Sequence, residues 1–126
     1  MGLCLFAEDG DVGGPDASWS YSRFADFRRR LAAAEGFELN GMLGFGGDRQ
    51  WSTVLTALEP LLDHADTHGN LSAADCAAVL PRLVEIIDRW AADVPDPALT
   101  AQIGTARDLA RVMFLCVARD VPLAFG

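Results

Sequence analysis

The residues of this chain with the clearest capacity for chemistry lie in one segment, residues 64–75. It reads His-Ala-Asp-Thr-His-Gly-Asn-Leu-Ser-Ala-Ala-Asp. A helix–loop–helix calcium site places oxygen ligands at alternating positions, with glycine sixth, an apolar residue eighth and an acid twelfth. Counted from His64, this segment has Gly69 sixth, Leu71 eighth and Asp75 twelfth. Its spacing is therefore that of a calcium loop.

The ligand types fit calcium less well than the spacing does. His64 and His68 stand first and fifth, and imidazole nitrogen is a poor ligand for a hard cation. Together with Asp66, the third residue, they could instead converge on zinc or nickel, which accept nitrogen beside carboxylate. The candidate metal ligands are therefore His64, Asp66, His68 and Asp75, and the ion is calcium or a transition metal.

The same segment also makes sense without an ion, as a tight reversal between two packed segments. Gly69 would then take a left-handed backbone conformation, Leu71 would enter the core and Ser72 would cap the next helix. Because the ligand set is poor, we favour this interpretation. We expect no cofactor, with a divalent ion as the alternative.

The segment is also similar to part of a protein family. It resembles an uncharacterised family of short bacterial and phage proteins whose shared core reads roughly Leu-Leu-x-His-Ser-Asp-Cys-Asp-Gly-x-Leu-Ser. The similarity extends from about Trp19 to Trp90, and it implies the loop but no established activity. The chain departs from the family pattern at three positions, where the family has Ser, Cys and Asp: Ala65, Thr67 and His68. The matching residues are Leu61, Leu62, His64, Asp66, Gly69, Leu71 and Ser72, with Trp51 and the Gly46-Gly47 pair upstream.

Other patterns that suggest catalysis or phosphate binding fail on one required residue each. A zinc peptidase needs Glu directly after the first of two histidines four apart, and this chain has Ala65. A phosphate-binding loop needs Lys where Gly47 follows three earlier glycines. No Ser or Cys sits in a nucleophile motif. We therefore do not expect an enzyme, and a metal-dependent hydrolase is only a third alternative.

The charge and the cysteine content of the chain limit which partners and which cellular compartment we expect. The net charge is −8 and all ten basic residues are arginines, so the chain would repel a nucleic-acid backbone. Arg23 and the run 28–30 form a local basic patch, but consecutive helical residues point in different directions, so we expect a solvated surface. The odd number of cysteines, three, predicts reduced thiols and a cytoplasmic location. No apolar run reaches membrane-spanning length.

The length of 126 residues predicts one domain, residues 1–126. Apolar periodicity predicts helices over 22–35, 52–62, 72–90 and 97–119, and Pro81 predicts either a kink in the third of these or its division into two abutting helices. Residues 3–7, with a second stretch near Trp19, predict a short N-terminal β segment. We therefore expect a mainly α protein, a compact bundle of about four helices with an EF-hand-like helix–loop–helix.

The last helix carries an unusually wide apolar face in its second half, where Val112, Phe114 and Leu115 widen the stripe. Such a face is either central to the core or covered by a partner. The role that the sequence favours is therefore a small acidic protein-interaction module, with partner and oligomeric state open. Metal-dependent regulation through residues 64–75 is the alternative.

Overall fold

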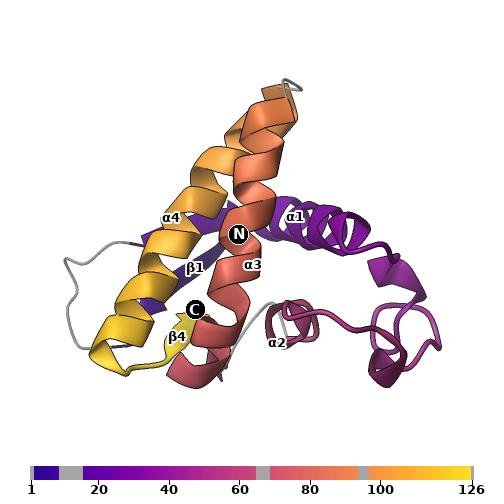
Figure 1. Ribbon diagram of the computed structural model, residues 1–126, viewed down its shortest axis with the longest axis horizontal. Helices are drawn as coiled ribbons and strands as arrows, with labels where there is room; N and C mark the ends of the chain where they lie inside the picture. Colours follow the sequence, from indigo (N-terminus) through magenta and orange to yellow (C-terminus); the bar gives the residue numbers. More distant parts are fainter. Residues whose placement is uncertain (1, 9–15, 65–68, 94–96, 126) are drawn as a thin grey trace.

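A computed structural model describes residues 2–8, 16–64, 69–93 and 97–125, and within them the fold is mixed α/β. A four-stranded antiparallel sheet is covered on one face by helices (Figure 1). The strands are β1 (Gly2–Ala7), β2 (Asp16–Ser20), β3 (Asn70–Leu71) and β4 (Leu123–Phe125). The helices are α1 (Tyr21–Ala34), α2 (Glu59–Leu62), α3 (Ala73–Asp93) and α4 (Pro97–Arg119), and 3-10 turns occupy Leu39–Gly41 and Trp51–Thr53.

The sheet brings the two ends of the chain together, in the order β2-β1-β4-β3. β1 pairs with β2 on one side, with Leu3 opposite Trp19, and with β4 on the other, with Leu5 opposite Phe125. Leu71 of β3 lies opposite Leu123 of β4. The C-terminal strand therefore connects the loop before α3 to the N-terminal hairpin.

Only one face of the sheet is buried, because side chains alternate along each strand. Leu5 and Trp19 point towards the helices and are buried, whereas Phe6 and Ser18 point the other way and are exposed. α3 and α4 lie side by side in front of the strands in Figure 1 and form an antiparallel hairpin. The core fills the space between this hairpin, α1 and the inner face of the sheet.

Aromatic rings join α1 to the sheet and to α3. The indole of Trp19 stacks on the ring of Phe27 at 4.8 Å between centroids, and Trp90 meets Phe27 edge-on at 6.3 Å. The indole Nε1 of Trp19 donates a hydrogen bond to Oε1 of the buried Gln102 of α4, at 3.2 Å. Because a buried indole N–H needs an acceptor, Gln102 is the polar residue that lets Trp19 lie inside.

The prediction of a mainly α bundle is wrong. Of the residues that the structure describes, 62% are helical, but the protein also has a four-stranded antiparallel sheet, so it is not a clean helical bundle. The N-terminal strands were expected; β3 and β4 were not. These two strands are two and three residues long, and they are stabilised by pairing with distant parts of the chain rather than by a local pattern.

The predicted helix over residues 52–62 is also wrong in extent. The structure has a 3-10 turn, an extended stretch and then the single helical turn of α2. Pro60 lies in the first turn of α2, where its missing N–H is harmless, rather than inside a longer helix. Leu55, an apolar residue inside the predicted range, is 98% exposed. Of the two helices that the predicted EF-hand-like helix–loop–helix requires, only the one after the loop is therefore full-length.

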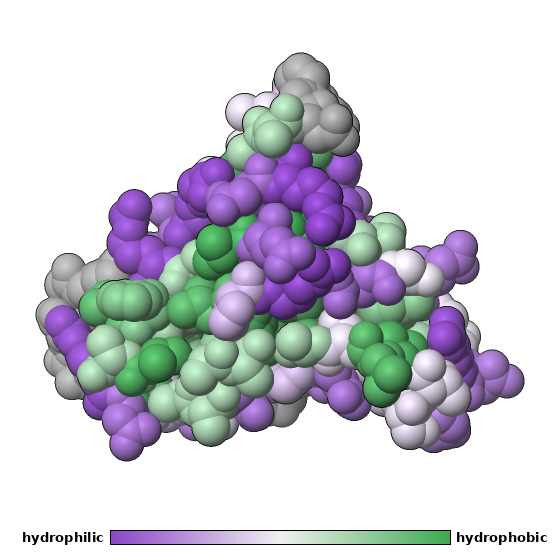
Figure 2. All heavy atoms as spheres, in the orientation of Figure 1, coloured by the Kyte–Doolittle hydropathy of each residue, from purple (hydrophilic) through white to green (hydrophobic). Residues whose placement is uncertain are grey.

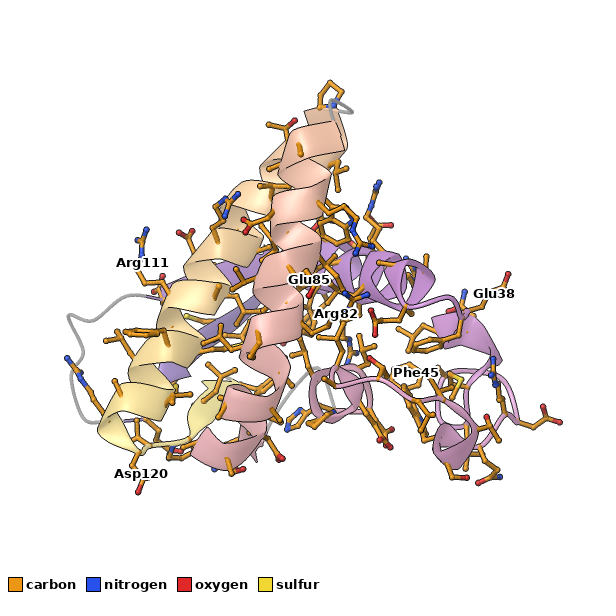
Figure 3. All side chains as sticks on the ribbon, viewed as in Figure 1. Glu38, Phe45, Arg82, Glu85, Arg111 and Asp120 are labelled. Atoms are coloured by element: carbon orange, nitrogen blue, oxygen red, sulfur yellow. The ribbon has the colours of Figure 1, made fainter. Side chains whose placement is uncertain are left out.

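The bounds of the other long helices lie close to those predicted from the sequence. α1 begins after Ser20, whose hydroxyl accepts a hydrogen bond from the backbone N–H of Arg23. α3 continues through the exposed Pro81 as one helix, so the expected division there does not occur. A salt bridge between Arg82 of α3, which Figure 3 labels, and Glu35, at 2.6 Å, links this middle stretch of α3 to the end of α1.

Candidate functional site

Of the four predicted metal ligands, the structure describes His64 and Asp75, whereas Asp66 and His68 lie outside the described residues. His64 follows α2, and Asp75 lies in the first turn of α3. Among the residues that the structure describes, no three His, Cys, Asp or Glu side chains gather as they would around a metal ion. Metal binding by the complete set of four residues stays a prediction.

The imidazole of His64 contacts the backbone of its own loop. Its Nε2 lies 2.9 Å from the backbone carbonyl oxygen of Asn70, and since a carbonyl only accepts, Nε2 carries the proton. In a calcium loop the first side chain and the seventh carbonyl both bind the ion. Here these two positions, His64 and Asn70, bond to each other directly.

Three further residues of the described loop have the structural roles predicted for them from the sequence. Gly69 has a φ of +95°, and a Cβ there would lie 3.3 Å from Cε1 of His64, so both backbone and space favour glycine. Leu71 is 3% exposed and lies in the core. The Ser72 hydroxyl accepts the backbone N–H of Asp75 at 3.1 Å, which caps α3. The described part of the loop is thus closed by protein contacts.

His64 also attaches the loop to the C-terminal strand. Its ring stacks on Phe125 with 4.0 Å between centroids and 18° between planes. Beside this pair the backbone N–H of Phe125 donates to the carbonyl of Gly69 at 3.0 Å. Nε2 and one ring face of His64 therefore both take part in contacts that hold the loop against the C-terminal strand.

A second polar site opens next to His64 and was not predicted as one. A cavity of about 420 Å³ lies between α1, the 3-10 turn after it and the segment that follows α2. Two arginines from consecutive positions of α1 contribute to its wall. Its lining residues are Ala25, Arg28, Arg29, Leu39, Asn40, Gly44, Phe45, Asp63 and His64.

Arg28 is buried at the base of this cavity, only 4% exposed. Its guanidinium carbon lies 4.9 Å from the ring centroid of Phe24 and 5.3 Å from that of Phe45, within cation–π range of both. Its Nη1 donates to the carbonyls of Leu62 and His64, at 3.3 and 2.5 Å. Arg28 thus satisfies carbonyls at the end of α2, where the helix itself cannot.

Our expectation that the arginine run 28–30 forms a solvated surface is wrong for Arg28. The sequence held a signal, because Arg28 stands four residues after Phe24 and three before Leu31, on the apolar stripe of α1. Asp63 lines the same cavity, and its pKa is raised by partial burial, an effect that the charges of Arg28 and His64 oppose.

The third feature is an apolar surface on the outside of the α3–α4 hairpin, which we call the hairpin patch. Phe114 is 62% exposed, Val117 39% and Val84 37%, although all three are large hydrophobic residues. Figure 2 shows hydrophobic side chains gathered over the part of the hairpin that holds the start of α3 and the end of α4. The patch consists of Ala77, Pro81, Val84, Phe114, Val117 and Ala118, all exposed.

The cysteines form no site within the described residues. Cys76 of α3 and Cys116 of α4 are buried, and burial first, with the neighbouring Cys116 second, raises the pKa of Cys76 to about 12. The pKa of the half-buried Cys4 is raised too, mainly by desolvation. Thiols in this state are protonated at neutral pH, and a protonated thiol is a poor nucleophile.

Comparisons with known proteins add no family to this picture. No protein-family model, no curated protein and no solved structure matches the chain. Within the ranges that the structure describes, none of the helices combines the length and apolar character needed to span a bilayer. Any role must therefore be inferred from the loop, the cavity and the hairpin patch themselves.

Proposed function

We propose that this protein is an interaction module that binds protein through the hairpin patch, and that its partner is a second copy of the chain. The observation that carries this proposal is the exposure of Phe114, 62%, on a helix whose opposite side is packed into the core. Contiguous apolar surface on a soluble domain marks an interaction site more often than isolated exposed residues do. The wide apolar face of this helix therefore serves both the core and a partner.

Charge favours a second copy over a strongly basic partner. Although the whole chain carries −8, the hairpin sequence from Ala73 to Arg119 has almost as many arginines as acidic residues. Two hairpins can thus approach without strong repulsion, because the excess negative charge lies mainly in the N-terminal half. At physiological salt that more distant charge is screened over about 8 Å.

The residues around the patch are also self-complementary. Arg111 and Asp120 are exposed and flank Phe114 and Val117 on either side along the chain (Figure 3). If two α4 helices pack antiparallel around a two-fold axis with Phe114 of one copy opposite Val117 of the other, Arg111 of each faces Asp120 of the other. One register therefore satisfies both the apolar and the charged pairs, as an isologous dimer requires.

Sedimentation velocity over a wide concentration range tests this proposal. We expect a concentration-dependent dimer for the natural chain and at least a tenfold weaker association for Phe114→Asp. The matched control is Leu55→Asp, since Leu55 is the most exposed leucine described, at 98%, and lies outside the hairpin. A chain that stays monomeric at every concentration, or a Phe114→Asp variant that dimerises as well as the control, would overturn the proposal.

The three free thiols support a cytoplasmic location for this module, because a reducing compartment keeps unpaired cysteines stable. Divalent-metal regulation through residues 64–75 is the alternative function, and the loop spacing supports it.

A further inference from the structure

We infer that the cavity between α1, the glycine-rich loop (residues 41–47) and His64 is a binding site for a small molecule. The ligand would carry a phosphate or carboxylate group. This site is separate from the hairpin patch and does not depend on dimerisation. Its volume of about 420 Å³ falls in the range of small-molecule sites. Three chain segments converge on it, so it is formed by the fold rather than by one helix.

Two arginines, one buried and one exposed, give the cavity a preference for anionic ligands. Arg28, 4% exposed, is fixed at the base by the aromatic rings of Phe24 and Phe45 and by its bonds to two carbonyls. Arg29 is exposed and lines the same cavity, so its guanidinium can move to meet a ligand. A buried arginine in partly desolvated surroundings attracts an oxyanion more strongly than a surface arginine does.

The cavity lining also includes a side chain that can form hydrogen bonds and a stretch of backbone that no side chain covers. Asn40 lies in the 3-10 turn after α1 and contributes a side-chain amide. Gly44, with a φ of +91°, contributes a wall with no side chain in the way. Gly44, from the glycine run that fails as a nucleotide-phosphate motif, thus lines the same cavity as the two arginines.

Among the described residues that line the cavity, Asp63 is the one acidic residue, and we assign the selectivity of the cavity to it. Its carboxylate opposes an anion but can accept a hydrogen bond from a ligand that also carries a donor. Replacing Asp63 by Asn therefore leaves the shape while removing the repulsion. The opposite effect follows from Arg29→Gln, which removes one attractive charge from an exposed position.

Chemical-shift titration of the ¹⁵N-labelled chain, at constant ionic strength, tests this site with inorganic phosphate and, separately, acetate. We expect saturable shifts at Asn40, Gly44 and His64 with at least one of the two anions. Arg29→Gln should weaken that binding at least fivefold and Asp63→Asn should strengthen it. The matched control is Arg107→Gln, an exposed arginine of α4 that lies outside the hairpin patch and far along the chain from the cavity.

The two arms identify the ligand group, since phosphate alone indicates a phosphate monoester and acetate alone indicates a carboxylate. The spectra of each variant also report whether it has folded. No saturable binding of either anion would overturn the inference. Equal weakening by Arg29→Gln and Arg107→Gln would overturn it too, because it would show a general charge effect.

Discussion

The imidazole of His64 lies nearly parallel to the ring of Phe125, 4.0 Å away, while its Nε2 donates to the carbonyl of Asn70. One side chain thus joins the segment after α2 to both β3 and β4. The loop that resembles a calcium site by spacing is therefore closed by a histidine in the residues described. The contribution of this histidine to stability can be measured.

Replacing His64 by Ala should lower the free energy of unfolding by about 1–3 kcal/mol, the sum of a hydrogen bond and an aromatic contact. His64→Phe should recover part of this loss, because it keeps the stacking on Phe125 and removes only the hydrogen bond. Urea unfolding followed by circular dichroism measures both. Equal stability of His64→Ala and the natural chain would contradict the structural role.

Removal of divalent ions should leave the melting temperature unchanged, since the described loop is closed by protein groups. The measurement is differential scanning fluorimetry after chelation and after addition of calcium, zinc or nickel. A rise in melting temperature that disappears in the His64→Ala, Asp66→Ala double variant would instead establish the metal-binding alternative. Protein purified without a histidine tag is needed, because a tag binds the same ions.

Gly47→Ala should destabilise the glycine-rich loop by at least about 2 kcal/mol, by a steric clash. A Cβ at Gly47 would overlap the carbonyl group of Gly41, and that group is backbone, which cannot give way cheaply. Gly41→Ala is the matched control, because a Cβ there meets nothing within 4 Å. Thermal unfolding compares the two, and similar losses in both variants would argue against this close approach.

Alkaline stability should depend on Cys76. Its pKa is raised from the ordinary value of 9.0 to about 12 by burial, so the unfolded chain loses this proton first. The contribution is fully present below pH 9 and falls as pH rises towards 12, by at most about 1.4 kcal/mol per pH unit. Cys76→Ala should flatten this slope in urea titrations at several pH values. An unchanged slope would show that other groups control it.

How far the sequence predicts the fold depends on the range over which each element is stabilised. α4 carries its own signals, a proline in its first turn and a long apolar stripe, and the structure has it over the expected residues. β3 and β4 carry no such signal, because Leu71 and Leu123 form a strand pair only once α3 and α4 have brought them together. Short strands of this kind depend on tertiary pairing.

The residues of the candidate sites also differ in whether local sequence or tertiary contacts determine their roles. Gly69, Leu71 and Ser72 have the local roles that their types indicate, in backbone conformation, core packing and capping. The cavity beside His64 could not be predicted, because it depends on where the residues after α2 contact α1. Arg28 shows the difference, since its place on an apolar stripe was visible in the sequence but its carbonyl partners were not.

The most direct test of the proposed dimer is a charge exchange between Arg111 and Asp120. Each single variant, Arg111→Asp or Asp120→Arg, should be monomeric in sedimentation velocity, because like charges would then face each other in both pairs. An equimolar mixture of the two should dimerise again, because the aspartate introduced into one chain then faces the arginine introduced into the other. A mixture that stays monomeric, under conditions where the natural chain is dimeric, would contradict this antiparallel arrangement.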